Sequence, residues 1–219
     1  MSGWKMVIAF VAFPAVAGAA YFSAAGRLDL PFAWGVLGVL AVFSLLMFLT
    51  TDPGMRRERR RPGPGNRDRL TRPATLLLIL AHWIIAGLDA GRFQWSPVPW
   101  PVQLAGLIGY ALAMAGALWA MRANPFYSSV VRIQADRGQY PVTTGPYRYV
   151  RHPGYTFTML GIVFGGLTLG SWVGMVPVVG GMVLFVHRTL LEDSMLRREL
   201  AGYAEYAGRV RYRLVAGVI

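Results

Sequence analysis

Polar and aromatic side chains gather in residues 123–155, where their types could bind and orient a small molecule. Aromatic faces attract cations, and arginine and amide groups hold anions and hydroxyls. Glycines and prolines recur within the stretch, so it cannot form one long helix. The tyrosines are Tyr127, Tyr140, Tyr147, Tyr149 and Tyr155. The polar side chains include Arg132, Gln134, Asp136, Arg137, Gln139, Arg148, Arg151 and His152.

A second pair of charged residues lies where a later apolar segment becomes polar. Arg188 and Glu192 are four residues apart, so they share one face of a helix. An arginine can orient an anionic acceptor, and a carboxylate can hold ribose hydroxyls or an ammonium group. The sequence shows no serine–histidine–acid arrangement, phosphate-cradling loop or paired catalytic carboxylates. These residues therefore favour a group-transfer reaction in which a cofactor supplies the reactivity and the protein supplies geometry.

Metal chemistry is not expected. The chain has no cysteine, which excludes thiolate ligands, and its three histidines lack the spaced acidic partners of a metal site. His82 falls inside an apolar segment, where a lone histidine is usually a hydrogen-bonding partner between helices. Asp89 falls near the outer end of the same segment, where we expect water to solvate it.

The elements that must position these residues are membrane spans. Hydrophobic residues make up 55% of the chain and charged residues only 15%, against about 25% in an ordinary soluble domain. Apolar blocks of suitable length must be helices, because lipid offers no partners to backbone polar groups. The blocks are Trp4–Ala25, Pro31–Thr50, Ala74–Ala90, Val102–Met121, Tyr155–Leu169 and Trp172–Leu191.

These blocks predict an all-α, polytopic membrane helical bundle of five to six spans. The last two blocks are separated only by Gly170 and Ser171, which predicts a helical hairpin. The apolar stripe Leu196, Leu200, Tyr203, Ala207 and Val210 predicts one amphipathic cytoplasmic helix at the C-terminus. We expect a four-helix transmembrane region in residues 1–121 and a cofactor-binding catalytic region in residues 122–219.

Basic residues predict the orientation of the bundle. Of the 22 lysines and arginines, only Arg27 and Arg92 fall in the two predicted outer loops. The positive-inside rule therefore places both termini in the cytoplasm, with Lys5 before the first span. The arginine run 56–61 is interpreted as a topology determinant that touches anionic lipid head groups. Because it lies between two spans, nucleic acid is not an expected partner.

Residues 130–214 resemble the isoprenylcysteine carboxyl methyltransferase family of integral membrane methyltransferases and its phospholipid methyltransferase relatives. The resemblance is carried by VTTGPYRYVRHPGY (142–155), a two-helix hairpin, RTLLED (188–193) and YAEYAGRVRYRL (203–214), in that order. It implies binding of S-adenosyl-L-methionine at the cytoplasmic face. It also implies methylation of a lipophilic small molecule or lipid-linked substrate that enters from the membrane lipids.

The resemblance also implies roles for individual residues. Arg188 matches the arginine that faces the acceptor, and Asp193 stands where the family has a second glutamate. The implied cofactor-binding residues are Gln139, Tyr140, Pro141, Val142, Tyr147, His152, Pro153, Gly154, Tyr155 and Glu192. An alternative role for His152 is to cap the helix that begins at Pro153. The sequence leaves the acceptor open between a carboxylate, an amine and a thiol.

Two other functions remain open. A sterol-type membrane reductase using NADPH resembles the chain around the histidine–proline–glycine–tyrosine turn, with Tyr147 or Tyr155 as the candidate proton donor. A small transporter or scaffold would require polar residues along a path through the bundle. The first four spans offer almost none beyond His82.

Overall fold

The computed structural model describes residues 3–217, and the side chains of residues 12–217. The predicted contribution of Lys5 to orientation lies outside the described side chains. Within residues 3–217 the regular elements are helices, which confirms the all-α class. The long helices are α1 (Gly3–Ala25), α2 (Pro31–Thr50), α4 (Thr71–Gly87) with its π-helical continuation η1 (Leu88–Phe93), α5 (Trp100–Ala123), α6 (Pro153–Thr168) and α7 (Met175–Glu199).

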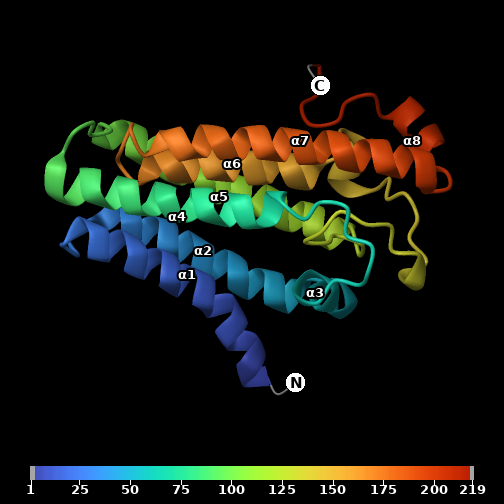
Figure 1. Ribbon diagram of the computed structural model, residues 1–219, viewed down its shortest axis with the longest axis horizontal. Helices are drawn as coiled ribbons and strands as arrows, with labels where there is room; N and C mark the ends of the chain where they lie inside the picture. The colour runs from blue at the N-terminus through green and yellow to red at the C-terminus, as the bar shows by residue number, and fades with distance from the viewer. Residues whose placement is uncertain (1–2, 218–219) are drawn as a thin grey trace.

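The long helices form a bundle whose members run along one axis (Figure 1). Among the described residues, α2, α4 with η1, α5 and α7 are long and apolar enough to cross a membrane. The chain is therefore an integral membrane protein. The described apolar part of α1 covers Ala12–Ala25, and α6 has 16 residues, fewer than the roughly 20 that span a bilayer. The predicted spans Trp4–Ala25 and Tyr155–Leu169 are both helical, and among the described residues four segments combine the length and hydropathy of a full span.

Small residues let the helices approach closely. A Cβ atom added to Gly87 of α4 would lie 2.4 Å from the backbone oxygen of Tyr21 in α1. A Cβ atom on Gly106 of α5 would lie 2.9 Å from the oxygen of Phe164 in α6. In a membrane, helices associate through such close packing because lipid removes the hydrophobic driving force. These contacts hold the α1–α4 and α5–α6 pairs together.

Asp89 lies buried at one end of the bundle, contrary to the expectation that water solvates it. Asp89 is fully buried. Its carboxylate accepts hydrogen bonds from the Ser96 hydroxyl at 2.6 Å and from the Ser171 hydroxyl at 2.5 Å. Ser171 follows Gly170, whose φ of +86° makes the predicted hairpin turn between α6 and α7. The acid thus joins the two loops at this end, where the sequence pattern showed only a helix terminus.

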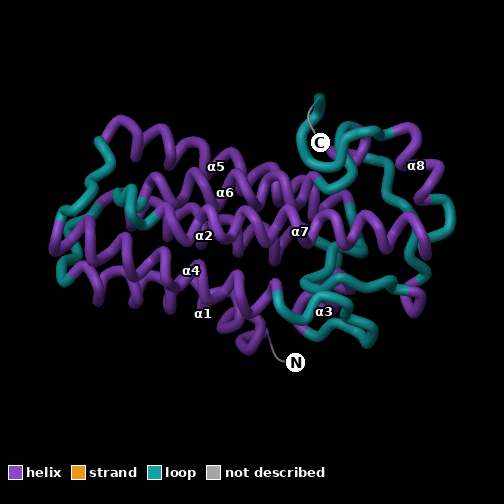
Figure 2. Tube along the Cα trace, turned by 45° about the horizontal axis from the view of Figure 1, so that its top comes forward, coloured by secondary structure: helices purple, strands orange, loops and turns teal. Residues whose placement is uncertain are grey.

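The opposite end, which we call the polar end, holds the segments 51–70, 124–152 and 200–217. Figure 2 shows these segments as loops gathered at one end of the helices, together with α3 (Pro53–Arg60) and α8 (Tyr203–Arg209). The helix α3 was not predicted. Asp52 begins it by accepting a hydrogen bond from the Met55 amide at 2.7 Å.

The predicted amphipathic stripe at the C-terminus is helical, but a turn divides it between the end of α7 and a separate short helix, α8. Helix α7 continues to Glu199, and the chain turns at Gly202, which has a φ of +78°, before α8 begins. Glycine adopts this left-handed conformation without the steric cost that other residues meet. The apolar stripe is nevertheless buried, because Leu196, Leu200 and Tyr203 pack around Val131. The turn therefore folds α8 onto the 124–152 segment instead of extending the helix.

Candidate functional site

The 124–152 segment is fixed by polar contacts along its length. The Arg132 guanidinium forms a buried ion pair with Glu58 of α3, with Nε 2.8 Å from Oε1, and also binds Asp136. Hydrogen bonds from Arg132 lower the pKa of Glu58 and keep it ionised. The buried Gln134 side chain donates to the Phe126 oxygen at 2.6 Å. Two short 3₁₀ turns, η2 (Ala135–Arg137) and η3 (Gly145–Arg148), complete the segment.

This segment, the start of α6, the end of α7 and α8 surround a polar pocket. Its empty volume, with the part open to solvent included, is about 720 Å³. Of the ten implied cofactor residues, all but Pro153 line it, although they are spread between positions 139 and 192. Pro153 is fully buried at the first turn of α6 and does not line the pocket. The remaining nine are Gln139, Tyr140, Pro141, Val142, Tyr147, His152, Gly154, Tyr155 and Glu192.

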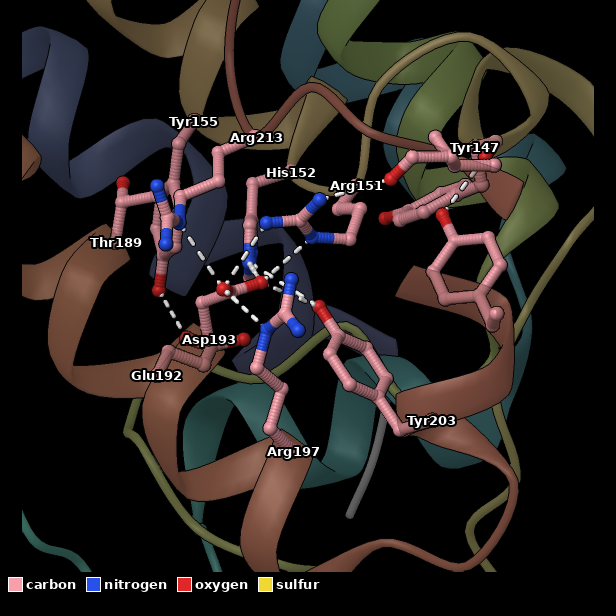
Figure 3. Close-up of polar contacts among 12 residues, drawn as sticks. Tyr147, Arg151, His152, Tyr155, Thr189, Glu192, Asp193, Arg197, Tyr203 and Arg213 are labelled. Atoms are coloured by element: carbon pink, nitrogen blue, oxygen red, sulfur yellow. Dashed lines mark hydrogen bonds and ion pairs between the residues drawn. The ribbon is translucent and has the colours of Figure 1, made fainter. Parts of the chain in front are cut away.

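Tyr155 connects the two residues that the sequence places on one face of α7. Its hydroxyl donates to Glu192 Oε2 at 2.5 Å and accepts a hydrogen bond from Arg188 Nε at 2.8 Å. Figure 3 shows Tyr155 beside Glu192 in this arrangement. Glu192 is half-buried and lines the pocket, so its carboxylate can bind a cationic or hydroxyl-bearing ligand. Arg188 is buried on the other side of Tyr155 and does not line this pocket.

Asp193, next to Glu192 in sequence, is a buried structural centre. Its carboxylate accepts hydrogen bonds from Arg151 Nε at 2.8 Å, from the Tyr203 hydroxyl at 2.9 Å and from Arg213 Nε at 3.0 Å, as Figure 3 shows. The His152 ring lies 3.2 Å from the same carboxylate. His152 occupies the N-cap position of α6, as the alternative role expected, but its backbone oxygen accepts the first helical hydrogen bonds while its side chain faces Asp193. Asp193 thus connects the turn before α6 with α8 and the C-terminal segment.

Tyrosines from separate elements form the aromatic wall of the pocket. The Tyr147 backbone oxygen accepts a hydrogen bond from the Tyr206 hydroxyl at 2.7 Å, which joins this tyrosine to α8. The Asn124 amide donates to the Tyr147 hydroxyl at 3.0 Å. Burial, and then the neighbouring Asp193 charge, raise the pKa of Tyr203, so its hydroxyl stays protonated. The wall offers faces to a cation or a planar base.

Part of this pocket is formed by residues that the sequence did not identify as binding residues. Asn124, Ser128, Leu196 and Leu200 also line it, and so do the aromatic rings of α8. Leu196 and Leu200 were assigned to packing alone, and Asn124 belongs to a helix end that carries no motif. The density of polar and aromatic residues from position 123 onward was the one available signal. This density identifies the segment, but it does not show which of its side chains line the pocket.

A second, apolar pocket lies inside the bundle. It is lined from α1, α2, α4, α5, α6 and α7, with Phe13, Val36, Ile79, Met114, Ile162 and Val178 among its residues. Thr158 of α6 lines it, and Gly154, one helical turn earlier, lines the polar pocket. His82 also lines it, and its Nδ1 lies 2.6 Å from the Gly174 oxygen, as expected for a partner between helices. Lining residues of the two pockets therefore lie four positions, or about 6 Å, apart along the axis of α6.

Among the described residues, no group of three or more histidine, cysteine or acidic side chains is placed to hold a metal ion. The polar pocket instead brings together the Glu192 carboxylate, several aromatic side chains and residues 139–142. This set fits a small cofactor with cationic, ribose and planar base groups, the chemistry of S-adenosyl-L-methionine.

Comparison with known proteins supports the resemblance over the region that holds the pocket. Residues 102–201 match the phospholipid methyltransferase family. The chain is 29% identical over 135 residues to the cobalt-zinc-cadmium resistance protein CzcN of Cupriavidus metallidurans. It is 26% identical over 134 residues to the nickel-cobalt-cadmium resistance protein NccN of Alcaligenes xylosoxydans xylosoxydans. Each match covers 60% of this chain, and 58% and 59% of the respective relative. The names of both relatives describe a resistance and state no reaction.

Proposed function

We propose that this membrane protein transfers a methyl group from S-adenosyl-L-methionine to a lipophilic acceptor held in the bilayer. The observation that carries the proposal is that a polar and an apolar pocket share α6, a helix that lies within the family-matched residues 102–201. The polar pocket has the groups that the cofactor requires, and a lining residue of the apolar pocket lies one turn further along α6. An acceptor with an apolar tail can stay in lipid while its reactive end reaches the polar pocket.

In this proposal the cofactor supplies a methyl group bonded to a positively charged sulfur. The sulfur–carbon bond breaks with its electron pair going to sulfur, and the acceptor atom supplies the pair for the new bond to carbon. The chain aligns the two partners and excludes water, which accounts for much of the rate in such in-line displacements. In this proposal Glu192 and the tyrosines of the polar pocket hold the cofactor. Arg188, which binds the Tyr155 hydroxyl from outside the polar pocket, orients the acceptor.

We also propose that the polar end lies in the cytoplasm, where S-adenosyl-L-methionine is made. The segments 51–73 and 122–151, which reach this end, contain 13 of the chain's 22 basic residues. Residues 188–219 add six more, and the positive-inside rule then sets the orientation. Labelling of single cysteines introduced at Arg57 and Arg92 with a membrane-impermeant reagent tests this, because only the one at position 92 should react from outside.

Binding measurements test the cofactor. Calorimetric titration of the full chain in detergent with S-adenosylhomocysteine should show saturable binding, and NADPH should show none. Binding of NADPH alone would replace this proposal with the reductase. If neither binds, the methyltransferase proposal is wrong for this chain. Transfer of labelled methyl groups from S-adenosyl-L-methionine into a lipid extract then tests the reaction itself.

Arg188 should affect turnover more than cofactor affinity. Arg188→Lys keeps the positive charge but loses the planar fork that binds Tyr155, Asp68 and the Ser129 oxygen at once. We expect methyl transfer to fall about tenfold or more, equivalent to one charge-assisted hydrogen bond. Affinity for S-adenosylhomocysteine should stay within about twofold. A loss of cofactor binding in this variant would show that Arg188 belongs to the cofactor site instead.

Gly154 should be intolerant of even a methyl group. A Cβ atom there would lie 2.2 Å from Cε2 of Tyr127, and both residues line the polar pocket. Gly154→Ala must therefore push the Tyr127 ring aside, and overpacking of this kind typically costs about 1–3 kcal/mol. We expect about tenfold weaker binding of S-adenosylhomocysteine in calorimetry. Gly208→Ala is the matched control, because nothing lies within 4 Å of its added Cβ atom. Equal affinities in the two variants would contradict the pocket assignment.

A further inference from the structure

The apolar pocket is lined by two residues whose polar side-chain atoms have no partner within the chain. Nε2 of His82 and Oγ1 of Thr75 are both buried, and within residues 12–217 neither has a hydrogen-bond partner. Both residues belong to α4 and line this pocket. Seven positions separate them, so they share one face of the helix and lie about 10 Å apart along its axis. Buried polar groups are nearly always hydrogen-bonded, so two unpaired groups at one apolar cavity point to a ligand that brings polar atoms into it.

The hydrogen bond that His82 makes to α7 defines what its other nitrogen can bind. Nδ1 lies 2.6 Å from the Gly174 oxygen, and a carbonyl oxygen only accepts, so Nδ1 carries the proton. An unpaired charge in an apolar cavity is costly, so the ring is neutral and Nε2 holds a lone pair. The complementary ligand group is therefore a donor. A hydroxyl fits this position, since an amine would enter charged and an amide would bring a carbonyl without a donor.

Glycines keep space open beside this histidine. The empty volume of the pocket, with its open part included, is about 800 Å³, within the usual range for small-molecule sites. Gly181 of α7 is buried and lines the pocket, yet a Cβ atom added there would meet nothing within 4 Å. Gly166 of α6 also lines it, and a Cβ atom there would lie 3.4 Å from His82 Cε1, the ring atom between the two nitrogens. The cavity therefore extends along the α6 and α7 side of His82.

The depth of His82 relates it to the tail of a ligand. Helix α4 begins at Thr71, next to the polar end, and His82 follows eleven positions later, or about 16 Å along the helix axis. Thr75 lies only about one turn from the start of the helix. A ligand whose reactive end reaches the polar pocket would therefore meet His82 along its tail.

We propose that the apolar pocket binds a lipophile that carries a hydroxyl group within its tail, and that Nε2 of His82 accepts the hydrogen bond from this hydroxyl. The inference rests on the proposed function only in taking this lipophile as the methyl acceptor, whose class it narrows to hydroxylated lipophiles. His82 is a specificity-determining residue in this scheme, because it selects a hydroxylated tail over a plain one. Thr75 offers a second hydrogen-bonding group nearer the polar end.

The first test uses the unaltered protein and two matched probes. Methyl ricinoleate differs from methyl oleate only by a hydroxyl about two-thirds of the way along its chain. The full chain in phosphatidylcholine nanodiscs is titrated with each ester, corrected for partition into empty nanodiscs. Methyl ricinoleate should bind about tenfold more tightly, the effect of one hydrogen bond to an otherwise unpaired buried group. Equal binding of the two esters, or binding of neither, overturns the proposal.

Nuclear magnetic resonance tests the contact at the atom itself. In protein labelled with ¹⁵N at histidine, the Nε2 resonance of His82 is identified by its loss in His82→Asn. Saturation with methyl ricinoleate should shift this resonance, and saturation with methyl oleate should leave it in place. A resonance that responds to neither ester would show that the hydroxyl does not reach Nε2, and the proposal would be wrong.

His82→Asn separates binding from the structural role of the histidine. The asparagine amide can still donate to the Gly174 oxygen, but no atom remains at the position of Nε2. Methyl ricinoleate should lose its tenfold advantage, while the affinity for methyl oleate stays within about twofold. His187→Asn is the matched control, because it makes the same substitution at an exposed histidine of α7 that does not line this pocket. An equal loss in both variants, or an unchanged preference in His82→Asn, overturns the role of His82.

Gly181→Val tests where the probes bind. Its side chain would occupy the open space inside the pocket, so both esters should bind about tenfold or more weakly. Gly38→Val is the control, because Gly38 also has nothing within 4 Å of an added Cβ atom but is exposed on α2, outside this pocket. Unchanged affinities in Gly181→Val would place the binding elsewhere and overturn the proposal.

The two proposals fail in different ways. Binding of S-adenosylhomocysteine to the unaltered chain tests the cofactor independently of the lipophile. If S-adenosylhomocysteine binds but the preference for the hydroxylated ester is absent, only the inference about His82 is wrong. If the hydroxylated ester is preferred but S-adenosylhomocysteine does not bind, the pocket assignment stands and the methyltransferase proposal is wrong.

Discussion

Asp193→Ala is expected to lower the free energy of unfolding by about 3–5 kcal/mol, the usual cost of removing one partner from a buried ion pair. Only 2% of the Asp193 side chain is exposed, and its carboxylate is the common acceptor for Arg151, Tyr203 and Arg213. Alanine would leave Arg151, whose side chain is 1% exposed, without its counter-charge. The turn before α6 and the α8 region should then separate, because this carboxylate joins them.

Thermal unfolding in detergent, followed by tryptophan fluorescence, measures this effect. Glu205→Ala provides the control, because that side chain is 76% exposed and pairs with Arg209 only at 3.8 Å on the same helix. Exposed pairs of this spacing contribute about 0.3–0.5 kcal/mol. Similar melting temperatures for the two variants would show that Asp193 does not hold the polar end together.

Glu192→Gln is expected to weaken binding of S-adenosylhomocysteine by about 10- to 100-fold while the melting temperature stays close to that of the unaltered chain. The substitution keeps the shape of the side chain and removes a negative charge that faces the polar pocket. A hydrogen bond to a charged group typically contributes about 1.5–3 kcal/mol, which corresponds to this loss of affinity. Glu192 is half-buried and has Tyr155 as its side-chain partner, so its removal leaves no buried cation unpaired.

Calorimetric titration and thermal unfolding of the same preparation give both readouts. The two adjacent acids can be compared directly. Glu192→Gln should weaken binding of S-adenosylhomocysteine, and Asp193→Ala should lower the melting temperature. If Glu192→Gln binds the ligand as tightly as the unaltered chain, Glu192 lies outside the cofactor site. If it unfolds as readily as Asp193→Ala, its role is structural.

Composition and charge placement were sufficient to predict a helical membrane protein. The apolar block Pro31–Thr50 coincides with α2, because lipid permits only helices and the length of an apolar block limits where each can end. The hairpin at Gly170 was predicted for a similar local reason, since a glycine with a φ of +86° suits a tight turn. The resemblance to membrane methyltransferases then selected residues that line one pocket.

Other features depended on contacts between distant residues. The turn at Gly202 could not be predicted from the sequence, because the helical spacing of apolar residues continues unchanged on both sides of it. Asp89 looked like a solvated helix end, and only the approach of Ser96 and Ser171 makes it a buried acceptor.

The sequence by itself determined the helical class, the membrane setting and the stretch that carries the polar chemistry, because these follow from composition and local period. The tertiary structure decided which of two adjacent acids faces the pocket. Consecutive residues on a helix point about 100° apart, so Glu192 and Asp193 must face different surroundings. Which surroundings each acid meets depends on how the turn before α6, α8 and the C-terminal segment pack against α7, and this packing joins Asp193 to Arg151, 42 positions earlier.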